Sequence, residues 1–404
     1  MRRRLLRWLA CPTCRRALQS VVAQSEARPV SPEDYAVLQS VAPVTASDDV
    51  EVDILVGALT CEHCRVYYPI HNGIPRLLSY STEVARVHAE VNAGWIRERL
   101  SGYVLPRGDP TPDDEAVLRN FSPESTGHKG TGTSRMPETP GNRKGYKLGI
   151  PGQHQKPDLV LAVGIGTGEA AEAISRYQDC EIVAMDLGSA ADQPQQHLGG
   201  NPRLHTVQGS VFAPPFPFGK FDLVYSHGVL HHTGRTREAF SRIARLARPG
   251  NGVLCLRLNS QEKEPTTPRG RMLMGLKRVM RATIGRLPEP VQNALVMPAV
   301  PFYILYHNVF ARRPRGLQLG PRYGFLVNAV FAGNEALHAA RDHLRTPFAG
   351  RHGLEELAHW FRAEGYSKLE LLPDEPAPEG TSSVDAVNLG VCGFRDELPK
   401  SRER

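Results

Sequence analysis

The chain has 404 residues, 41% of which are hydrophobic, and its formal net charge at pH 7 is +7. This length predicts two or three packed units, and the composition excludes a fibrous or wholly disordered protein. The positive charge favours anionic partners such as RNA, acidic lipid or a phosphorylated metabolite, but simple solvation of the surface explains an excess of this size equally well.

The amino terminus and the apolar segments predict a cytoplasmic protein without a membrane span. The first ten residues carry the charges of a secretory signal, but Arg7 interrupts their apolar run and Cys11 follows at once. The richest apolar stretch, residues 291–310, contains Gln292 and Asn293, which a spanning helix would have to bury in hydrocarbon. In the reducing cytoplasm, paired CxxC motifs hold a metal more often than they form disulfides.

Two CxxC pairs lie within residues 1–78. The two-residue spacing lets both sulfurs of a pair reach one ion, so the pairs together predict a four-thiolate site for structural Zn²⁺. Binding at such a site contributes about 10–16 kcal/mol, which is enough to fold a small module. The alternative is a pair of redox motifs. The predicted ligands are Cys11, Cys14, Cys61 and Cys64.

The segments between the two cysteine pairs, and between this zinc module and the next unit, have less regular patterns. Residues 21–55, between the cysteine pairs, exceed what a compact ribbon needs, and we expect them to form an inserted excursion. Residues 79–105 space their apolar side chains as a helix does. Residues 106–156 are rich in Gly, Pro, Ser and Thr and show no period, which predicts a long linker or lid loop.

Residues 157–260 alternate short apolar runs with helical patterns. This alternation is typical of an α/β fold with a Rossmann-like, doubly wound and mostly parallel sheet. The expected strands cover residues 159–163, 182–185, 204–208, 221–225 and 253–258, and the expected helices cover residues 169–177 and 236–247. A helix at 354–364 and strands near 369–372 and 386–394 would complete this core within residues 350–396, before a tail at 397–404. The other cysteines fall in or beside strands, where we expect buried packing residues: Cys180, Cys255 and Cys392.

Residues 261–349 separate the two parts of the core and predict a helical insertion. Apolar residues recur at helical spacing from Met272 to Leu287, while Lys277 and Arg278 fall largely elsewhere on the helix. A basic amphipathic helix can lie on a membrane or bind an acidic partner. More often such a helix packs its apolar face on the parent domain, and we expect this insertion to form a lid over a substrate pocket.

The most specific motif of the core is LVLAVGIGTGE at residues 159–169. In this motif a buried strand is followed by glycines at alternate positions and then by a helix. Glycine permits a sharp turn and the close approach of a ligand. The start of the helix favours a polar or anionic group of that ligand. One strand later Asp186 ends EIVAMD, where its carboxylate can accept the two hydroxyls of a ribose. A dinucleotide-binding fingerprint requires its third glycine at the position that Glu169 occupies here. In this chain the third glycine comes one residue earlier, at Gly168, so the spacing favours an adenosyl ligand over NAD.

Residues 158–258 resemble the core of class I S-adenosylmethionine-dependent methyltransferases. The resemblance rests on AVGIGTGE, on EIVAMDL, and on the run from HTVQGSVFAPPF through GVLHH to LARPGNGV, which follow one another in the family's order. It implies that the glycines line the methionine and ribose portions, that the acid binds the ribose, and that residues after the later strands surround the adenine and the methionine end. The implied cofactor residues are Gly164, Gly166, Gly168, Asp186, Leu187, Ser210, Val211 and Ser226.

The chain departs from this family at two positions. The family usually has an acid at the position of Ala162, which helps to hold the methionine end. It often has another at the position of Ser210, which binds the adenine amino group. The departures imply weaker cofactor binding, an atypical acceptor or a repurposed site.

The first 78 residues resemble the Trm112-like zinc ribbon. The resemblance rests on LACPTCRRAL and on GALTCEHCRVYYPIHNGIPRLL, in which the second cysteine pair continues into a YPI, GIP and LL run. In that family the metal is structural, because four thiolates leave no open position for catalysis. The ribbon often precedes a methyltransferase core, which is the order found here.

Methyl transfer from a sulfonium is downhill, so orientation of the acceptor can provide most of the acceleration. A general base is needed only when the acceptor arrives protonated and weakly nucleophilic. The loop after the fourth strand lies at the carboxyl edge of the sheet, where ligands bind in such folds. Its candidate bases are His227, the better placed, and His231, which the family often keeps for structural reasons. His343 and His352 could also face the acceptor.

Three functions fit the sequence. The first is O- or N-methylation of a small-molecule or natural-product acceptor, with the insertion and the linker closing over it. The second is methylation of RNA, because six arginines crowd around the first cysteine pair: Arg2, Arg3, Arg4, Arg7, Arg15 and Arg16. The third is a non-catalytic partner protein, in which the ribbon binds other methyltransferases and the core has lost turnover.

Overall fold

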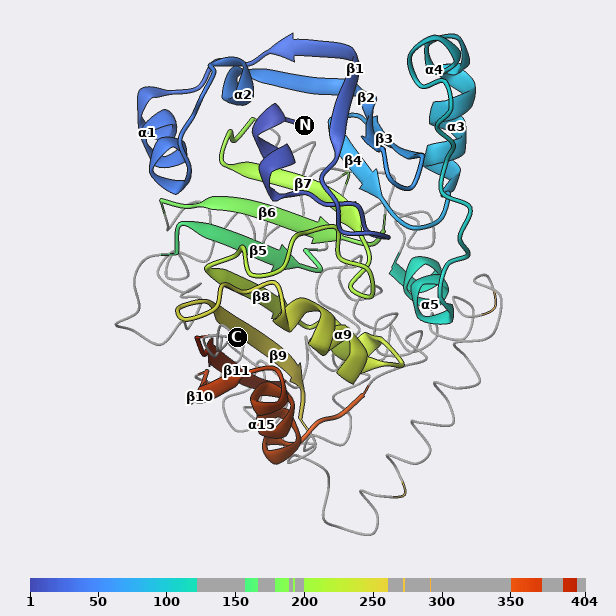
Figure 1. Ribbon diagram of the computed structural model, residues 1–404. Coiled ribbons are helices and arrows are strands. Elements are labelled where there is room, and N and C mark those ends of the chain that lie inside the picture. The colour runs from blue at the N-terminus through green and yellow to red at the C-terminus, as the bar shows by residue number, and fades with distance from the viewer. Residues whose placement is uncertain are drawn as a thin grey trace, which may run out of the picture.

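The computed structural model describes residues 1–121, 157–165, 179–188, 200–260, 350–372 and 388–397, and the isolated positions 192, 272 and 291. Within these residues the strands form one sheet in the order β1-β2-β3-β4-β7-β6-β5-β8-β9-β11-β10 (Figure 1). The expected helix at 169–177 and nearly all of the expected insertion at 261–349 lie outside the described residues.

The centre of the sheet is the parallel core that the sequence predicts. Its strands are β5 (Leu159–Val163), β6 (Glu181–Asp186), β7 (Leu204–Gly209), β8 (Leu223–His227) and β9 (Val253–Asn259). Neighbouring strands from β7 to β9 all run parallel. Nearly all of their side chains are buried, as in strands covered on both faces. The predicted Rossmann-like α/β fold is thereby confirmed. The chain winds from β5 first to one side and then to the other, so the carboxyl end of β5 is the switch point at which such sheets bind ligands.

Two antiparallel strands complete the far end of the core. β11 (Asn388–Arg395) pairs with β9, and β10 (Tyr366–Leu371) pairs with β11. Two helices, α9 (Thr236–Ala244) and α15 (Leu354–Ala363), pack together beside these strands. The rings of Phe240 and Phe361 meet edge-on with centroids 5.0 Å apart, and Tyr366 packs against Phe361 at 5.5 Å. These aromatic contacts hold residues 350–372 on the core.

A disulfide joins Cys255 of β9 to Cys392 of β11. The expectation of buried cysteines is confirmed, and Cys180 is buried and takes no part in this disulfide. The expectation that Cys255 and Cys392 serve only for packing is wrong, because the register of β9 and β11 sets them directly opposite each other, with Cα atoms 4.1 Å apart. They lie 137 residues apart in the chain, so no local pattern reveals the pair. Disulfides are uncommon in the reducing cytoplasm, and the cytoplasmic location stays a prediction.

The amino-terminal unit is an antiparallel ribbon. Its strands are β1 (Gln19–Ala27), β2 (Val52–Cys61), β3 (Val66–His71) and β4 (Ile74–Leu77), and its helices are η1 (Arg3–Trp8), α1 (Pro32–Val41) and α2 (Asp48–Glu51). The excursion expected at residues 21–55 is an arm of this ribbon, because β1 pairs with β2 along its whole length and α1 and α2 connect the two. Asn72 and Gly73 have φ angles of 52° and 74°, as a tight hairpin turn between β3 and β4 requires.

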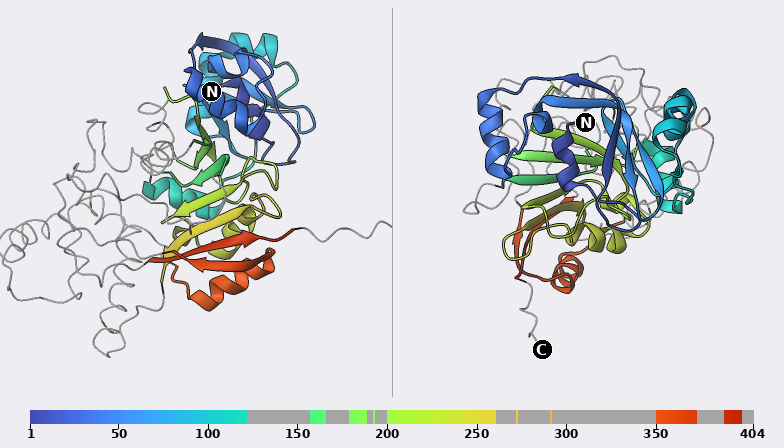
Figure 2. Two further views of the ribbon diagram at one scale, coloured as in Figure 1. Left: turned by 90° about the vertical axis from the view of Figure 1, so that its left-hand side faces the viewer. Right: turned by 45° about the horizontal axis from the view of Figure 1, so that its top comes forward.

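The ribbon and the core share one sheet. β4 pairs in parallel with β7 through Arg76 with Gln208 and Leu77 with Gly209. Without the ribbon, β7 would be an edge strand with unpaired backbone groups, which folded proteins rarely leave uncovered. Figure 2 shows the ribbon at one end of the sheet and β10 and β11 at the other. The edge of the ribbon formed by β4 is therefore occupied by the core of the same chain.

Three helices connect the ribbon to the core. The helical pattern of residues 79–105 forms α3 (Glu83–Val91) and α4 (Ala93–Arg99). The expectation of a loop throughout 106–156 is wrong at its start, because α5 (Pro112–Phe121) forms there. Thr111 caps α5, accepting a hydrogen bond from the N–H of Asp114 at 3.1 Å, and proline is the first helical residue. No helix in the described part of the chain is long and apolar enough to cross a bilayer.

Candidate functional site

The turn after β5 requires glycine at position 164. Gly164 has a φ of 72°, and a Cβ atom built on it would lie 2.2 Å from a methyl carbon of Val229. Its N–H donates to the carbonyl of Met185 at 2.8 Å, which holds the turn against the end of β6. A larger residue would displace the loop after β8. The next glycines of the motif, Gly166 and Gly168, lie outside the described residues.

Asp186 ends β6 beside this turn. Its Oδ1 accepts a hydrogen bond from the N–H of Gly188 at 2.9 Å, which orients the carboxylate at the tip of the strand. The carbonyl of Leu187 accepts one from Nε2 of Gln208 on β7, also at 2.9 Å. The glycine turn and the acid that the sequence predicts on successive strands are therefore neighbours at one edge of the sheet.

Ser210 and Val211 follow β7 at the same edge. Ser210 is buried; its Oγ donates to Oδ1 of Asp114 at 2.7 Å and accepts from the N–H of Phe212 at 3.2 Å. Val211 is half-buried and packs against the core. Sequence reasoning missed Asp114, which lies 96 residues earlier in α5. The cap signal before α5 could have indicated the helix, but no local signal indicates the contact with Ser210.

The end of β8 carries the residues expected near the methionine end and the candidate bases. Ser226 is buried, and its Oγ has no hydrogen-bond partner among the described residues. His227 is half-buried at the end of β8. His231 is buried in η4 (Leu230–His232), with its ring centroid 4.2 Å from that of His232. His227 is thus the more accessible of the two candidate bases.

The other positions singled out in the sequence lie within β5, at the carboxyl end of β9, where the N–H of His352 donates to the carbonyl of Asn259 at 2.9 Å, or outside the described residues. Ala162 is buried within β5, paired with both β6 and β8. Nδ1 of His352 lies 3.2 Å from a carboxylate oxygen of Glu356, the next turn of α15. His343 is not among the described residues. No described contact joins His352 to the glycine turn.

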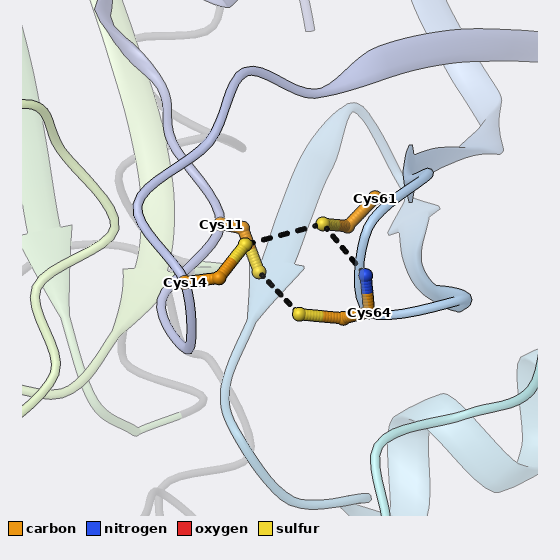
Figure 3. Close-up of side chains that lie close together, drawn as sticks. All are labelled: Cys11, Cys14, Cys61 and Cys64. Carbon is orange, nitrogen blue, oxygen red and sulfur yellow. Dashed lines mark hydrogen bonds between the residues drawn. The ribbon is translucent and has the colours of Figure 1, made fainter.

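The four predicted metal ligands converge on one point (Figure 3). The Sγ atoms of Cys11, Cys14, Cys61 and Cys64 all lie within 4.8 Å of one another. The Cys14 to Cys61 distance is 3.5 Å and the Cys11 to Cys64 distance is 4.0 Å. A tetrahedral Zn²⁺ with Zn–S bonds of about 2.3 Å requires sulfurs about 3.8 Å apart. The four sulfurs are therefore close to the spacing that zinc requires.

The surroundings of the four sulfurs also suit a structural metal. Arg15 and Arg65, which follow the two cysteine pairs, have φ angles of 65° and 55°, so the two turns have matching shapes. The N–H of Cys64 donates to Sγ of Cys61 at 3.5 Å, and the hydroxyl of Tyr68 lies 3.3 Å from Sγ of Cys11. Donors of this kind stabilise metal-bound thiolates. The donor set fits Zn²⁺ and leaves no protein-provided open position.

The first cysteine pair is bound to the loop that follows Ser210. Nη1 of Arg15 donates to the carbonyls of Pro214 and Phe216 at 2.6 and 3.0 Å. The N–H of Ala10 donates to the carbonyl of Pro215 at 2.9 Å. The turn that contains Cys11 and Cys14 therefore supports the loop after β7 directly.

A buried charge cluster joins η1 to the opposite edge of the core. Nε of Arg4 lies 2.9 Å from both carboxylate oxygens of Glu181, and both side chains are fully buried. Nε2 of His205 lies 2.9 Å from the same carboxylate, and Nε1 of Trp8 donates to it at 3.2 Å. Burial acts to raise the pKa of Glu181, but the hydrogen bond and charge of His205 and the charge of Arg4 outweigh it and hold this pKa below its ordinary value. The carboxylate is therefore ionised at neutral pH.

Two family models match the chain. Residues 161–256 match a methyltransferase domain, and residues 2–73 match Trm112p-like proteins. The methyltransferase match covers the strands that form the candidate site, and the other covers all four cysteines.

Curated relatives match part of the chain. A malonyl-[acyl-carrier protein] O-methyltransferase of Methylovorus is 31% identical over 101 residues, which are 23% of this chain and 34% of the relative. Methyltransferase str3 of Strobilurus tenacellus is 33% identical over 101 residues, 24% of this chain and 35% of the relative. O-methyltransferase cnsE of Penicillium expansum is 23% identical over 186 residues, 42% of this chain and 67% of the relative. The chain thus spans about a third of the length of the first two relatives.

Solved structures resemble the chain at low identity. The apo form of the S-adenosylmethionine-dependent methyltransferase SibL is 14% identical with a TM-score of 0.37, over 62% of this chain and 54% of SibL. A complex of the Haloferax volcanii Trm112 methyltransferase activator with a methyltransferase is 12% identical with a TM-score of 0.35, over 71% of this chain and 94% of that one.

Proposed function

We propose that this chain, in which a methyltransferase domain follows a Trm112p-like domain, is an S-adenosylmethionine-dependent methyltransferase. The observation that carries the proposal is the hydrogen bond from Gly164 to Met185, which sets the glycine turn against the residue before Asp186. This arrangement suits an adenosyl ligand, because the carboxylate can accept the two ribose hydroxyls while the glycine leaves space for the attached chain.

In this reaction the residues of the chain bind the cofactor and orient the acceptor. S-adenosylmethionine, when bound, supplies a methyl group on a sulfonium, and its transfer to a nucleophile is downhill. Asp186 would hold the ribose, and the hydroxyl of Ser226, which has no hydrogen-bond partner in the described part of the chain, would meet the methionine end. For an acceptor that arrives protonated, His227 is the better placed base, since His231 is buried. Orientation by these groups would provide most of the acceleration.

The zinc site has a supporting role in this proposal. Its four thiolates leave no position for substrate, and its first turn is hydrogen bonded to the loop after β7 through Arg15 and Ala10. Bound zinc would keep this loop in place at the adenine side of the ligand. Loss of the metal would then weaken cofactor binding without removing a reacting group.

The acceptor that we propose is a small molecule or natural product, methylated on oxygen or nitrogen. Two of the three relatives described above are named O-methyltransferases, one of them for a malonyl group on a carrier protein. The RNA alternative has less support, because the arginines around the first cysteine pair are largely engaged within the chain. Arg2 and Arg4 are buried, and Arg15 binds backbone carbonyls.

The partner-protein alternative also has less support. Its ribbon is already joined to a core, because β4 pairs with β7 of the same chain. The buried contact of Arg4 with Glu181 strengthens this internal union. We infer that the ribbon serves the core to which it is fused.

The test of the proposed function is label transfer from radiolabelled S-adenosylmethionine, offered separately with a small-molecule extract, with total RNA and with a protein extract. The proposal expects label in the small-molecule fraction. Gly164→Ala should abolish transfer, because its Cβ would meet Val229. Gly94→Ala is the matched control, because a Cβ in α4 meets nothing within 4 Å. Label in RNA alone would replace the acceptor class, and no label in any fraction would contradict the activity.

A further inference from the structure

The amino end of α5 is fastened to the carboxyl edge of the sheet. Oδ1 of Asp113 accepts from the N–H of Gly234 at 2.7 Å, and its Oδ2 accepts from Nε of Arg235 at 2.6 Å. The neighbouring Asp114 accepts from Ser210 at 2.7 Å. In Figure 1, α5 lies beyond the arrowheads of β6 and β7. α5 therefore spans from the loop after β7 to the start of α9.

The carboxylate of Asp114 is buried and forms no ion pair with another described residue. Its residue is 3% exposed, and the hydrogen bonds that it accepts come from the hydroxyls of Ser210 and Thr111 and the backbone of Thr111. The charges that act on it include the like charge of Asp113 and the opposite charge of Arg235. Burial raises the pKa of Asp114, which is the expected cost of an ionised group held away from water. Arg235, the nearby cation of this loop, is taken by Asp113.

An unpartnered polar group accompanies this carboxylate. The hydroxyl of Tyr80 is buried and has no hydrogen-bond partner among the described residues. The charges of Asp114 and Glu115 act on it, so it lies close to the amino end of α5. A buried carboxylate and a nearby buried hydroxyl that has no partner among the described residues are costly unless a ligand pairs with them.

The position of this pair along the sheet edge indicates which part of a ligand it would meet. The glycine turn follows β5, the ribose-binding acid ends β6, and Ser210 and Asp114 stand at the end of β7. These strands are neighbours in the order β5, β6, β7. A ligand whose ribose lies at Asp186 and whose chain runs toward Gly164 must therefore direct its base toward β7.

We propose that Asp114 recognises the base of the cofactor by accepting a hydrogen bond from the exocyclic amino group of adenine. The proposal rests on the proposed function. Ser210 is too short to do this alone, and its hydroxyl instead orients the carboxylate that α5 brings in. A carboxylate accepts from a 6-amino group and repels the oxygen of a 6-oxo group, so Asp114 selects adenine over hypoxanthine. The base is then read by a helix outside the parallel core.

The test is isothermal titration of the full, zinc-loaded chain with S-adenosylhomocysteine and with S-inosylhomocysteine, which carries a 6-oxo group. Wild-type protein should bind the adenosyl compound about 10-fold or more tightly than the inosyl compound. Asp114→Asn should lose about 10-fold or more in affinity for the adenosyl compound and should lose the preference, because an amide can donate to the 6-oxo group. Glu115→Gln, which neutralises an exposed acid on the same helix, should change neither value.

A swapped pair separates recognition from folding. Ser210→Asp combined with Asp114→Ser moves the carboxylate onto β7 and should restore the preference for adenine. Unchanged affinity and preference in Asp114→Asn, with an unchanged melting temperature, would overturn the proposal. Should Asp114→Asn fail to fold, a swapped variant that folds but lacks the preference would overturn it instead. Wild-type protein that binds neither compound would overturn the proposed function itself, and the inference with it.

Discussion

Replacing Arg4 by methionine should destabilise the whole chain, because it breaks the buried ion pair that joins the ribbon to the core. Nε of Arg4 contacts both carboxylate oxygens of Glu181 at 2.9 Å, and neither side chain is exposed. Breaking a buried pair from one side typically costs about 3–5 kcal/mol, because the remaining charge stays buried. His205 and Trp8 still contact the carboxylate and keep the loss within this range.

The assay is urea denaturation at pH 7, followed by tryptophan fluorescence. Arg3→Met is the matched control, because Arg3 is exposed on the same turn and its loss should cost less than about 0.5 kcal/mol. The double variant Arg4→Met with Glu181→Leu should regain about half or more of the stability lost, because it removes the uncompensated charge. An Arg4→Met variant as stable as the control would refute the reasoning.

The same pair fixes the pH dependence of this effect. The pKa of Glu181 is lowered in the folded chain, so its contribution is complete above the ordinary carboxyl pKa and is lost as the pH falls through the lower folded value. In urea denaturation, the wild-type chain should therefore keep the whole of this Glu181 contribution between pH 7 and pH 5.5. A loss of this contribution between these two pH values would contradict the depressed pKa.

The remaining predictions concern the metal, the disulfide and the cap of α5. A colorimetric zinc assay should find one zinc ion in the purified chain. Cys61→Ser should lose the zinc and unfold the ribbon, whereas the control Cys180→Ser should retain it. Equal zinc contents in the two variants would refute the site. Peptide mapping without reductant should find Cys255 linked to Cys392, and free thiols at both positions in refolded protein would contradict the pairing. Thr111→Ala should lower the free energy of unfolding by about 1 kcal/mol and weaken the binding of S-adenosylhomocysteine, because the Thr111 cap positions α5. An unchanged melting temperature and an unchanged affinity would contradict this role.

The parts of the fold, and the positions of candidate site residues, that the structure places as the sequence predicts are those that depend on local pattern. Gly164 and Asp186 are predictable because each ends a buried strand, and parallel strands bring their carboxyl ends to one edge. The four cysteines are predictable because a two-residue spacing already restricts each pair to one ion. In both cases the chemistry is contained within a few consecutive residues.

The parts that escaped prediction depend on contacts between distant segments. Asp114 meets Ser210 across 96 residues, and the disulfide spans 137. The helix around Asp114 was hidden by the Gly- and Pro-rich composition that follows it, although the threonine and proline before it are start signals. The union of β4 with β7 is also invisible in sequence, because the parallel ladder is short and neither strand differs in pattern from an edge strand.

The most direct measurement of the central claim is equilibrium binding of S-adenosylmethionine to the zinc-loaded chain, with NAD as the competing ligand. The account predicts saturable binding of one cofactor per chain, no displacement by NAD, and a loss of about 10-fold or more in Asp186→Ala, which removes the acceptor for the ribose hydroxyls. Absence of binding at millimolar S-adenosylmethionine, or saturation by NAD, would contradict it.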